Sequence, residues 1–402
     1  MTCPKQNFGT YYGVIMKKIL NFVLVFALLV SCFTLFAACD NDKTDSGDKD
    51  LGFTYELVTD GDDSYLKVTG YNVSDEVTDL VSKKNFSSEK IQAVSKIEIP
   101  TGNVEYKRNG TVVGSYPVKE IAESAFSNML FIKEVVIPSN VETVGNACLA
   151  GCTRLEKVTV PFVGNKNEGN VNSKKTFAYL FGVSEVSDAT SSTIKYNATG
   201  SFSCYIPNSL KTVVLTGNTV SDYAFYGLTN VEEIVVPESV TEYGAYAFAN
   251  CSSLYKFAVT DKVTAIGEGA FSGCTSLVNV GLNEAAALTT IGNSAFSGCS
   301  LLFYSVDDAR YGLTANLTYV GEKAFNGCTS LATVNLTALS GKTATLKNSA
   351  FSGCTALEEV LLPADNANIT YENLVFTGCS KLTKENVTNY VNLHIFDFDY
   401  DA

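Results

Sequence analysis

The sequence predicts a mainly β repeat solenoid, and two observations carry that prediction. One pattern returns about every 23 residues: VTEYGAYAFANCSSLYKFAV begins at Val240, VTAIGEGAFSGCTSLVNVGL begins at Val263, and both fit the template VxxIGxxAFxxCxxLxxVxI. The apolar residues also fall at fixed places in the template, so that one short coil can share its interior with the next. Self-similarity at a period of about 20–50 residues is typical of stacked-repeat architectures.

Nine copies of the template can be traced by their Ala-Phe pair or its substitute. The second residue of the pair recurs at intervals of 23 to 29 residues, except for one interval of 76 that marks an insertion. The pairs are Ala125-Phe126, Cys148-Leu149, Ala224-Phe225, Ala247-Phe248, Ala270-Phe271, Ala295-Phe296, Ala324-Phe325, Ala350-Phe351 and Val375-Phe376.

The coil that Val263 begins shows what each template position is expected to do. LxxVxI predicts one parallel strand, because Val280 and Leu282 lie two residues apart and point to the same side. Val263 and Ile266, the V and I of VxxI, form a second apolar pair on a shorter segment. Gly267 is expected to supply a turn without a Cβ penalty, and Phe271 to fill the core from a short helical turn. A lone coil buries too little apolar surface to offset its backbone entropy, so the coils must fold as an array.

The composition of the chain changes along its length and predicts five regions. Residues 53–68 alternate apolar and polar residues around an Asp-Gly turn, which predicts a hairpin in the N-terminal cap. Phe396, Phe398 and Tyr400 alternate with acidic residues, which predicts a last strand. The regions are a signal peptide at 1–38 with a true start that could be Met16, a lipidated tether at 39–52, a cap and first degenerate coil at 53–117, the repeat array at 118–382 and a C-terminal cap at 383–402.

The insertion at 162–218 interrupts the array, and the repeat returns with Leu210, Val213 and Leu215. One interpretation is a single oversized coil whose extra residues form a side flap. The other is a ligand-binding appendage.

The N-terminal segment predicts export and a membrane anchor. Met16-Lys17-Lys18 precedes an apolar stretch, as in a signal peptide. The stretch ends in Leu35-Phe36-Ala37-Ala38-Cys39, which resembles a bacterial lipobox and implies cleavage before Cys39 and lipidation of its thiol. The alternative is an uncleaved span, because residues 19–38 are long enough to cross a bilayer. Either way, the repeats are expected to face the outside of the cell.

Seven of the twelve cysteines occupy the C of AFxxC: Cys152, Cys251, Cys274, Cys299, Cys328, Cys354 and Cys379. Other copies have Met129 or Leu228 at this position, which indicates an apolar core site where free cysteine acts as a small hydrophobe. The sequence therefore predicts a ladder of buried free thiols, with bridging between adjacent coils as the alternative.

The template is similar to that of the BspA-like leucine-rich repeat surface proteins of bacteria. Runs of the form IGxxAFxxCxxL, such as Ile266 to Leu277, carry the resemblance together with the Ile137-Pro138 step, and it covers roughly residues 92–382. The resemblance implies a right-handed solenoid of leucine-rich-repeat type, with one parallel strand plus a short helical turn per coil of about 23 residues. It also implies extracellular binding or adhesion and no catalytic residues.

Charge and residue types exclude several classes of function. The chain after residue 38 has 26 basic and 42 acidic residues, a net charge of −16, which argues against nucleic acid as a partner. His394 is the single histidine, so a metal site with several histidines is excluded, and no nucleophile elbow occurs. Acidic pairs near Asp40 and Asp397 lack the turn glycine and closing Glu of an EF-hand. We expect no enzyme, no cofactor and no metal, although two distant carboxylates of a glycosidase would leave no sequence signature.

The outward residues of LxxVxI form the candidate binding face. In the middle of the array, the small residues Ala258, Gly281 and Ser305 are flanked by Lys256, Asn279 and Phe303. An exposed aromatic beside small residues suits a docking groove. The alternative is an ordinary sheet surface. The assignment of Phe303 assumes that one residue is missing after Cys299, so that Leu301, Tyr304 and Val306 face inward.

These features together predict a non-catalytic binding or adhesion protein, lipid-anchored on the outer side of the bacterial membrane. Its partners would be a protein or glycan ligand at the cell surface, with membrane contact only through the lipid anchor and no nucleic acid. The alternatives are capture of glycan or peptide substrates for uptake, and a surface scaffold without a specific ligand.

Overall fold

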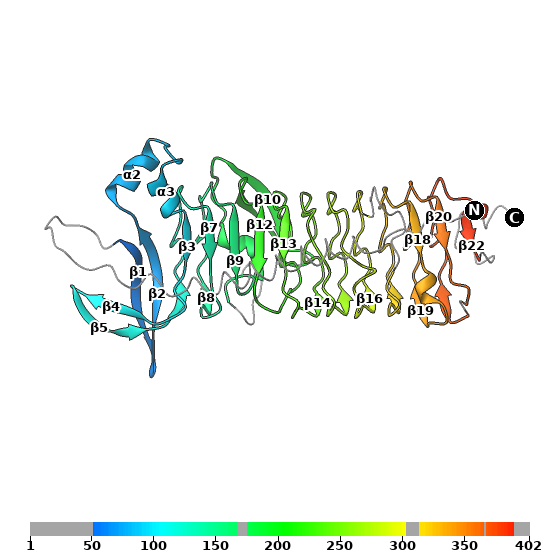
Figure 1. The fold of residues 1–402 in the computed structure, drawn as a ribbon, viewed down its shortest axis with the longest axis horizontal. Coiled ribbons are helices and arrows are strands. Elements are labelled where there is room, and N and C mark those ends of the chain that lie inside the picture. The colour runs from blue at the N-terminus through cyan, green and yellow to red at the C-terminus, as the bar shows by residue number, and fades with distance from the viewer. Residues whose placement is uncertain (1–50, 167–174, 303–312, 366, 390–402) are drawn as a thin grey trace, which may run out of the picture. The chain divides into compact units, whose positions relative to one another are not determined.

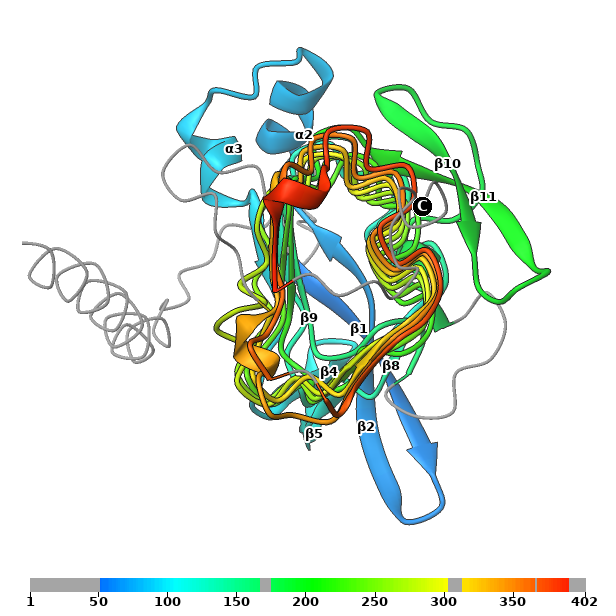
Figure 2. The ribbon, with the colours of Figure 1, turned by 90° about the vertical axis from the view of Figure 1, so that its right-hand side faces the viewer.

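The computed structural model describes residues 51–166, 175–302, 313–365 and 367–389. They belong to the second of the two compact units into which the chain divides, which begins at Asp50. Within this unit the coils follow one another along the chain, and they nearly superimpose when viewed from one end (Figure 1, Figure 2).

The array begins with an N-terminal region of hairpins and short helices. The predicted hairpin is present: β1 (Gly52–Asp60) pairs antiparallel with β2 (Asp63–Asn72). The strand β2 then pairs parallel with β6 (Val118–Ile121), so the hairpin extends the sheet of the first coils. The other elements of this region are α2 (Asp75–Ser82), α3 (Glu89–Ala93), β4 (Val104–Arg108) and β5 (Thr111–Tyr116).

Two positions of the template form short parallel strands, not only the one that the sequence predicted, although several coils have just one of the two. The LxxVxI positions form β3 (Lys96–Glu98), β7 (Glu134–Val136), β9 (Lys157–Val160), β12 (Thr212–Leu215) and β13 (Glu233–Val235), and later β18 (Thr333–Asn335), β20 (Glu359–Leu361) and β22 (Val387–Thr388). The VxxI positions form β8 (Thr143–Val144), β14 (Glu242–Tyr243), β15 (Ala265–Ile266), β16 (Thr290–Ile291), β17 (Tyr319–Val320), β19 (Ala344–Leu346) and β21 (Ile369–Tyr371). The last two residues of VxxI form a strand although it is so short, because their backbone groups are hydrogen-bonded to the neighbouring coils.

The Ala-Phe segment is a series of hydrogen-bonded turns, not the short helical turn that we expected. The N–H groups of Gly269, Phe271 and Gly273 donate to carbonyl oxygens of the next coil at 2.7–2.8 Å, whereas Ala270 and Ser272 donate three residues back. Gly269 and Gly273 have φ values of 57° and 77°. Left-handed residues and donors directed to the next coil are incompatible with a helix, and they add a third ladder of hydrogen bonds between coils.

The glycine of VxxIG is not needed for the turn that we expected, but for close packing against the preceding coil. Gly267 and Gly321 are absent from the positive-φ residues. A Cβ on Gly321 would instead lie 2.4 Å from the backbone N of Asn293, and one on Gly267 would lie 2.7 Å from the carbonyl O of Tyr243. Close approach of the preceding coil therefore requires glycine in these two coils.

Phenylalanine rings and thiols form continuous ladders in the interior. Phe225, Phe248, Phe271, Phe296, Phe325, Phe351 and Phe376 stack face to face in neighbouring coils, with centroids 4.8–5.5 Å apart and interplanar angles of 0–11°. The nine cysteines of the described residues are all buried free thiols, as the ladder hypothesis predicted. Each AFxxC thiol donates to a Phe carbonyl oxygen of the preceding coil, for example Cys274 Sγ to Phe248 O at 3.1 Å.

The insertion rejoins the array after a lateral hairpin. The short helix η2 (Phe177–Leu180) takes the place of an Ala-Phe turn, and Phe177 lies 5.8 Å from Phe225. The strands β10 (Ala189–Lys195) and β11 (Ser201–Pro207) pair antiparallel outside the coil, with Ile194 and Cys204 fully buried against it. The next strand, β12, pairs in register with β9, so the two sides of the insertion remain neighbours in one sheet.

The remaining elements lie near the C-terminus. They are the 3₁₀ helices η3 (Thr337–Leu339) and η4 (Lys384–Asn386), with β22 directly after the latter. Residues 1–50 and 390–402, which include the expected signal peptide, Cys39, His394 and the alternating Phe396, Phe398 and Tyr400, lie outside the described residues. Among the described residues, no helix has both the length and the hydrophobicity to cross a bilayer.

Candidate functional site

The residues predicted to form a binding face lie at a break in the LxxVxI sheet. Lys256 and Asn279 are exposed and lie in consecutive coils, whereas Phe303 falls outside the described residues. Lys256 Nζ lies 3.8 Å from a Glu233 carboxylate oxygen and 5.8 Å from the Tyr255 ring centroid. The Asn279 side-chain oxygen accepts a hydrogen bond from the N–H of Gly281 at 2.9 Å, which fixes a turn.

The sheet breaks here for reasons that the sequence shows. The strand β13 ends the five-stranded sheet, and the next coil continues only as a single bridge between Glu233 and Lys256. Phe257 occupies the V position with a much larger side chain, and Gly281 adopts a φ of 70°, which is incompatible with a strand. The coils therefore continue in this stretch without a regular ladder.

One inward assignment near this face was wrong. Leu301 was expected to face the core, but 41% of it is exposed, whereas Leu302 is fully buried. The coil therefore keeps the CxxL spacing without a missing residue. Leu301 joins Val235 and Tyr255, which are 42% and 44% exposed, as an apolar side chain on the outside of these coils.

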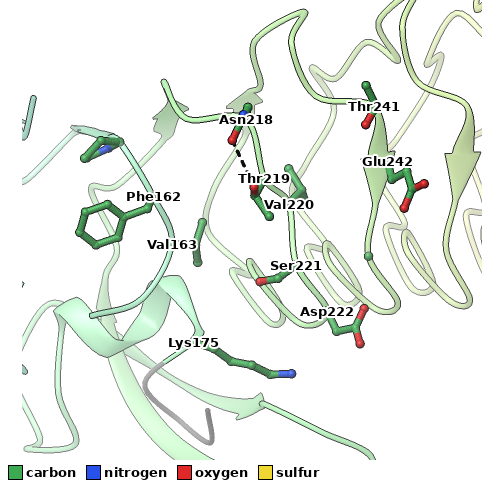
Figure 3. A pocket seen from close by; sticks show the side chains of 12 residues that line it. Phe162, Val163, Lys175, Asn218, Thr219, Val220, Ser221, Asp222, Thr241 and Glu242 are labelled. Carbon is green, nitrogen blue, oxygen red and sulfur yellow. Dashed lines mark hydrogen bonds between the residues drawn. The ribbon is translucent and has the colours of Figure 1, made fainter. Parts of the chain in front are cut away.

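A second feature is a cleft in the sheet of VxxI strands, beside the insertion. Its volume is about 580 Å³, within the range of ligand-binding clefts. Phe162 and Val163, from the segment after β9, form one wall, and residues 218–222 form the opposite wall (Figure 3). Thr241 and Glu242 come from the next coil.

At the cleft, the described residues of the VxxI sheet lack one strand. On one side, β8 bonds to the insertion through the Val144 N–H and the Asn165 carbonyl oxygen at 2.7 Å, and this pairing is antiparallel. On the other side, Val220 pairs parallel with Tyr243. No strand is assigned between these two segments among the described residues, and the six-stranded sheet begins at β14.

The floor of the cleft is apolar and its rim is charged. Phe162, Val163 and Val220 are 7%, 7% and 5% exposed. Asp222 and Glu242 are exposed carboxylates, and Lys175 lies at the same end of the cleft as Asp222 in Figure 3. One oxygen of Asp222 accepts a hydrogen bond from the N–H of Ala245 at 2.8 Å, which holds the carboxylate in place.

A protein-family model settles what kind of repeat this is. The model described as BspA type leucine rich repeat region (6 copies) matches residues 111–198, 200–311 and 302–397, which is more than half of the chain. The chain belongs to the BspA-type leucine-rich repeat family. A comparison with curated proteins finds no match.

Several solved bacterial structures are similar to this BspA-type protein. A leucine-rich repeat protein from Bacteroides ovatus is 17% identical, with 82% of this chain and 91% of that chain covered and a TM-score of 0.27. A leucine rich cell surface protein from Faecalibacterium prausnitzii is 18% identical, with coverages of 89% and 98% and a TM-score of 0.29. A leucine-rich repeat protein from Eubacterium ventriosum is 17% identical, with coverages of 86% and 90% and a TM-score of 0.32.

The cysteine thiols that the structure of this BspA-type protein describes are all buried in its interior. Burial raises the pKa of the Cys152, Cys251 and Cys299 thiols to about 12, so these groups stay protonated and unreactive at neutral pH. Within the described ranges, no three His, Cys, Asp or Glu side chains come close enough to hold a metal ion. What this arrangement offers a ligand is shape, apolar contact, backbone groups and charge.

The sequence did not predict the cleft, and the one unusual residue in it, Ser221, would not have been sufficient. Ser221 stands where the template has glycine, in the first complete copy after the insertion. Ser221 alone is no signal of a missing neighbour, because Lys347 and Glu372 also replace this glycine while their N–H groups donate to the preceding coil at 2.9 Å.

Proposed function

We propose that this protein is a non-catalytic binding protein of the bacterial cell surface, which attaches to protein ligands through the outside of its coils. The observation that supports this most directly is the exposed apolar surface at the break in the LxxVxI sheet. Val235, Tyr255 and Leu301 are three of the seven exposed large apolar side chains among the described residues, and Lys256 lies next to Tyr255. An aromatic and a lysine between apolar residues are suited to contact a protein.

Right-handed winding is also part of this proposal. Each coil leaves a short strand and returns to a parallel neighbour in the same sheet, as β15 and β16 do. Connections of this kind are right-handed in about 98% of cases, because a twisted strand packs back onto its sheet only in that sense.

The anchor is proposed from the N-terminal sequence. Residues 1–38 would be removed as a signal peptide, and residues 39–52, which contain a highly charged stretch, would link a lipidated Cys39 to the repeats. Several acyl chains on one cysteine would hold the protein stably at the membrane, whereas a single chain binds only marginally. The net charge of −16 after residue 38 would keep the repeats from lying on an anionic bilayer.

Replacing Cys39 by serine is expected to abolish lipid attachment. Cells grown with an alkyne-tagged palmitate should label the wild-type protein and not Cys39→Ser, because only a thiol at this position can be acylated. The labelled protein should also remain with the membrane fraction and be accessible to added protease. Cys251→Ser is the matched control, since this thiol is fully buried in the array. Equal labelling of Cys39→Ser would contradict the lipoprotein assignment.

The binding surface is tested with the full chain displayed on cells. Replacing Tyr255 and Lys256 together by alanine should weaken adhesion to an immobilised matrix protein (collagen, fibronectin or laminin) by about tenfold or more, as loss of central contact residues does. The thermal unfolding temperature should stay unchanged. Lys107→Ala with Val112→Ala removes a comparable exposed pair from the β4–β5 hairpin and serves as the control. Absence of adhesion to all three proteins would overturn the proposed function.

A further inference from the structure

The cleft beside the insertion leaves backbone donors without partners. In the coils that follow it, the N–H at the glycine position donates to the preceding coil: Gly244 to Val220 O at 2.9 Å, and Gly267, Gly292 and Gly321 to Tyr243 O, Ile266 O and Ile291 O at 2.8 Å each. Ser221 holds this position at the cleft, and its N–H has no hydrogen bond within the part of the chain that the structure describes. The same holds for the N–H of Thr219, two residues earlier and on the same side of the strand.

These donors lie on a wall that already has the geometry of a strand. Val220 forms a parallel bridge to Tyr243 on the far side, which fixes the extended backbone of this wall. The opposite wall is formed by the chain after β9, with Phe162 and Val163. The cleft therefore occupies the place where neighbouring coils would put a strand about 4.8 Å away.

The side chains around the cleft favour one kind of strand. The apolar floor formed by Phe162, Val163 and Val220 would accept an apolar side chain. The exposed carboxylates of Asp222 and Glu242 at the rim would attract a basic side chain, as would the net negative charge of the chain. Among the described residues that line the cleft, Lys175 provides the single opposing positive charge.

We propose that this cleft binds an extended peptide of a protein partner, which pairs with residues 218–221 and completes the interrupted sheet. The peptide places an apolar side chain on the floor and a basic side chain toward Glu242. This mode of binding is strand addition, in which backbone hydrogen bonds supply affinity and alternate side chains supply specificity. The inference rests on the proposed function as a protein-binding surface molecule, and it names the partner's chemistry and its place on the chain.

The first test uses peptides, because strand pairing requires hydrogen bonds from the N–H groups of the peptide backbone. A phage library of random heptapeptides is selected on the full-length protein, and the selected sequences should alternate apolar residues with polar ones and carry Lys or Arg. Single N-methylation along a selected peptide should then raise Kd by about tenfold or more at every second residue, because only alternate N–H groups of a strand face its neighbour. A loss that does not alternate, or a selection without such peptides, overturns the inference.

The second test changes the protein. Ser221 is exposed at the cleft, so Ser221→Phe should fill the space and raise the Kd of the same peptide by about tenfold or more, whereas Ser87→Phe on the distant N-terminal region should not. Glu242→Gln should raise Kd several-fold and reduce its dependence on salt, and Glu284→Gln should change neither. Far-UV circular dichroism checks that each variant is folded.

The two proposals fail in different ways. If cells bind a matrix protein through the Lys256 surface but Ser221→Phe leaves peptide binding unchanged, the cleft inference is wrong and the proposed function stands. If peptides bind the cleft but no matrix protein is bound, the adhesion role is wrong and strand addition stands.

Discussion

Replacing Phe296 by alanine is expected to lower the free energy of unfolding by about 3–5 kcal/mol, the usual cost of removing a buried aromatic ring. The ring is fully buried and stacks on Phe271 and Phe325, with centroids 5.2 Å away on both sides. Stacked pairs add about 0.5–1.5 kcal/mol each beyond the buried area. The measurement is urea denaturation of the wild type and the variant, followed by circular dichroism.

The position of Phe296 in the ladder predicts a second effect. Each coil contacts only its neighbours, so a cavity in the middle should uncouple the two halves of the array. The variant should unfold in two steps rather than one. Phe296→Leu is the matched control, because Leu149 occupies the same template position in another coil and is fully buried there. An alanine variant no less stable than the leucine variant would contradict a ladder of stacked rings.

The composition of the interior could be predicted from the sequence because the template repeats it. Phe271, Cys274 and Leu277 were all assigned to the core, and each is fully buried. A residue that recurs at the same template position packs against the equivalent residue of each neighbouring coil. The buried thiols could be predicted for the same reason, since Met and Leu replace Cys in two copies.

The hydrogen bonding between coils could not be predicted in the same way. VxxI offers only a two-residue strand, which has no stability of its own and forms because Thr290 and Ile291 meet Ala265 and Ile266. The Ala-Phe segment resembles a helical turn in sequence, yet its alternate donors are directed to the next coil. Both corrections arise because the partner of each backbone group lies one full coil away.

The candidate site depends on a neighbour that is absent, which a local pattern does not encode. Ser221 in place of glycine was visible in the sequence, but Lys347 and Glu372 make the same replacement in coils whose neighbours are present. The break at Lys256 likewise follows from the bulk of Phe257 and the backbone of Gly281. The sequence placed candidate residues on this stretch without predicting that the sheet would end there.

The thiol ladder is expected to make the protein unfold in mild alkali. Burial raises the pKa of Cys152, Cys251 and Cys299 to about 12, and it also raises the pKa values of Cys274 and Cys328. An unfolded thiol has a pKa of about 8.5, so it ionises on unfolding while the folded thiol stays protonated. Stability is therefore complete below about pH 8.5 and falls by up to about 1.4 kcal/mol per pH unit for each thiol, until the folded pKa is reached.

Several such thiols together should cost on the order of 5–10 kcal/mol within one or two pH units, which is comparable to the whole stability of a typical domain. The measurement is the free energy of unfolding in urea between about pH 8 and 9, where an unfolded tyrosine with a pKa of about 10 is still about nine-tenths protonated. Cys251→Ala with Cys299→Ala should be less stable at pH 7 because of the cavities, yet it should lose stability less steeply as pH rises, by up to two fewer protons released on unfolding. A slope that is the same in both proteins would show that these thiols ionise alike when folded and unfolded, which is incompatible with a dry, continuous interior.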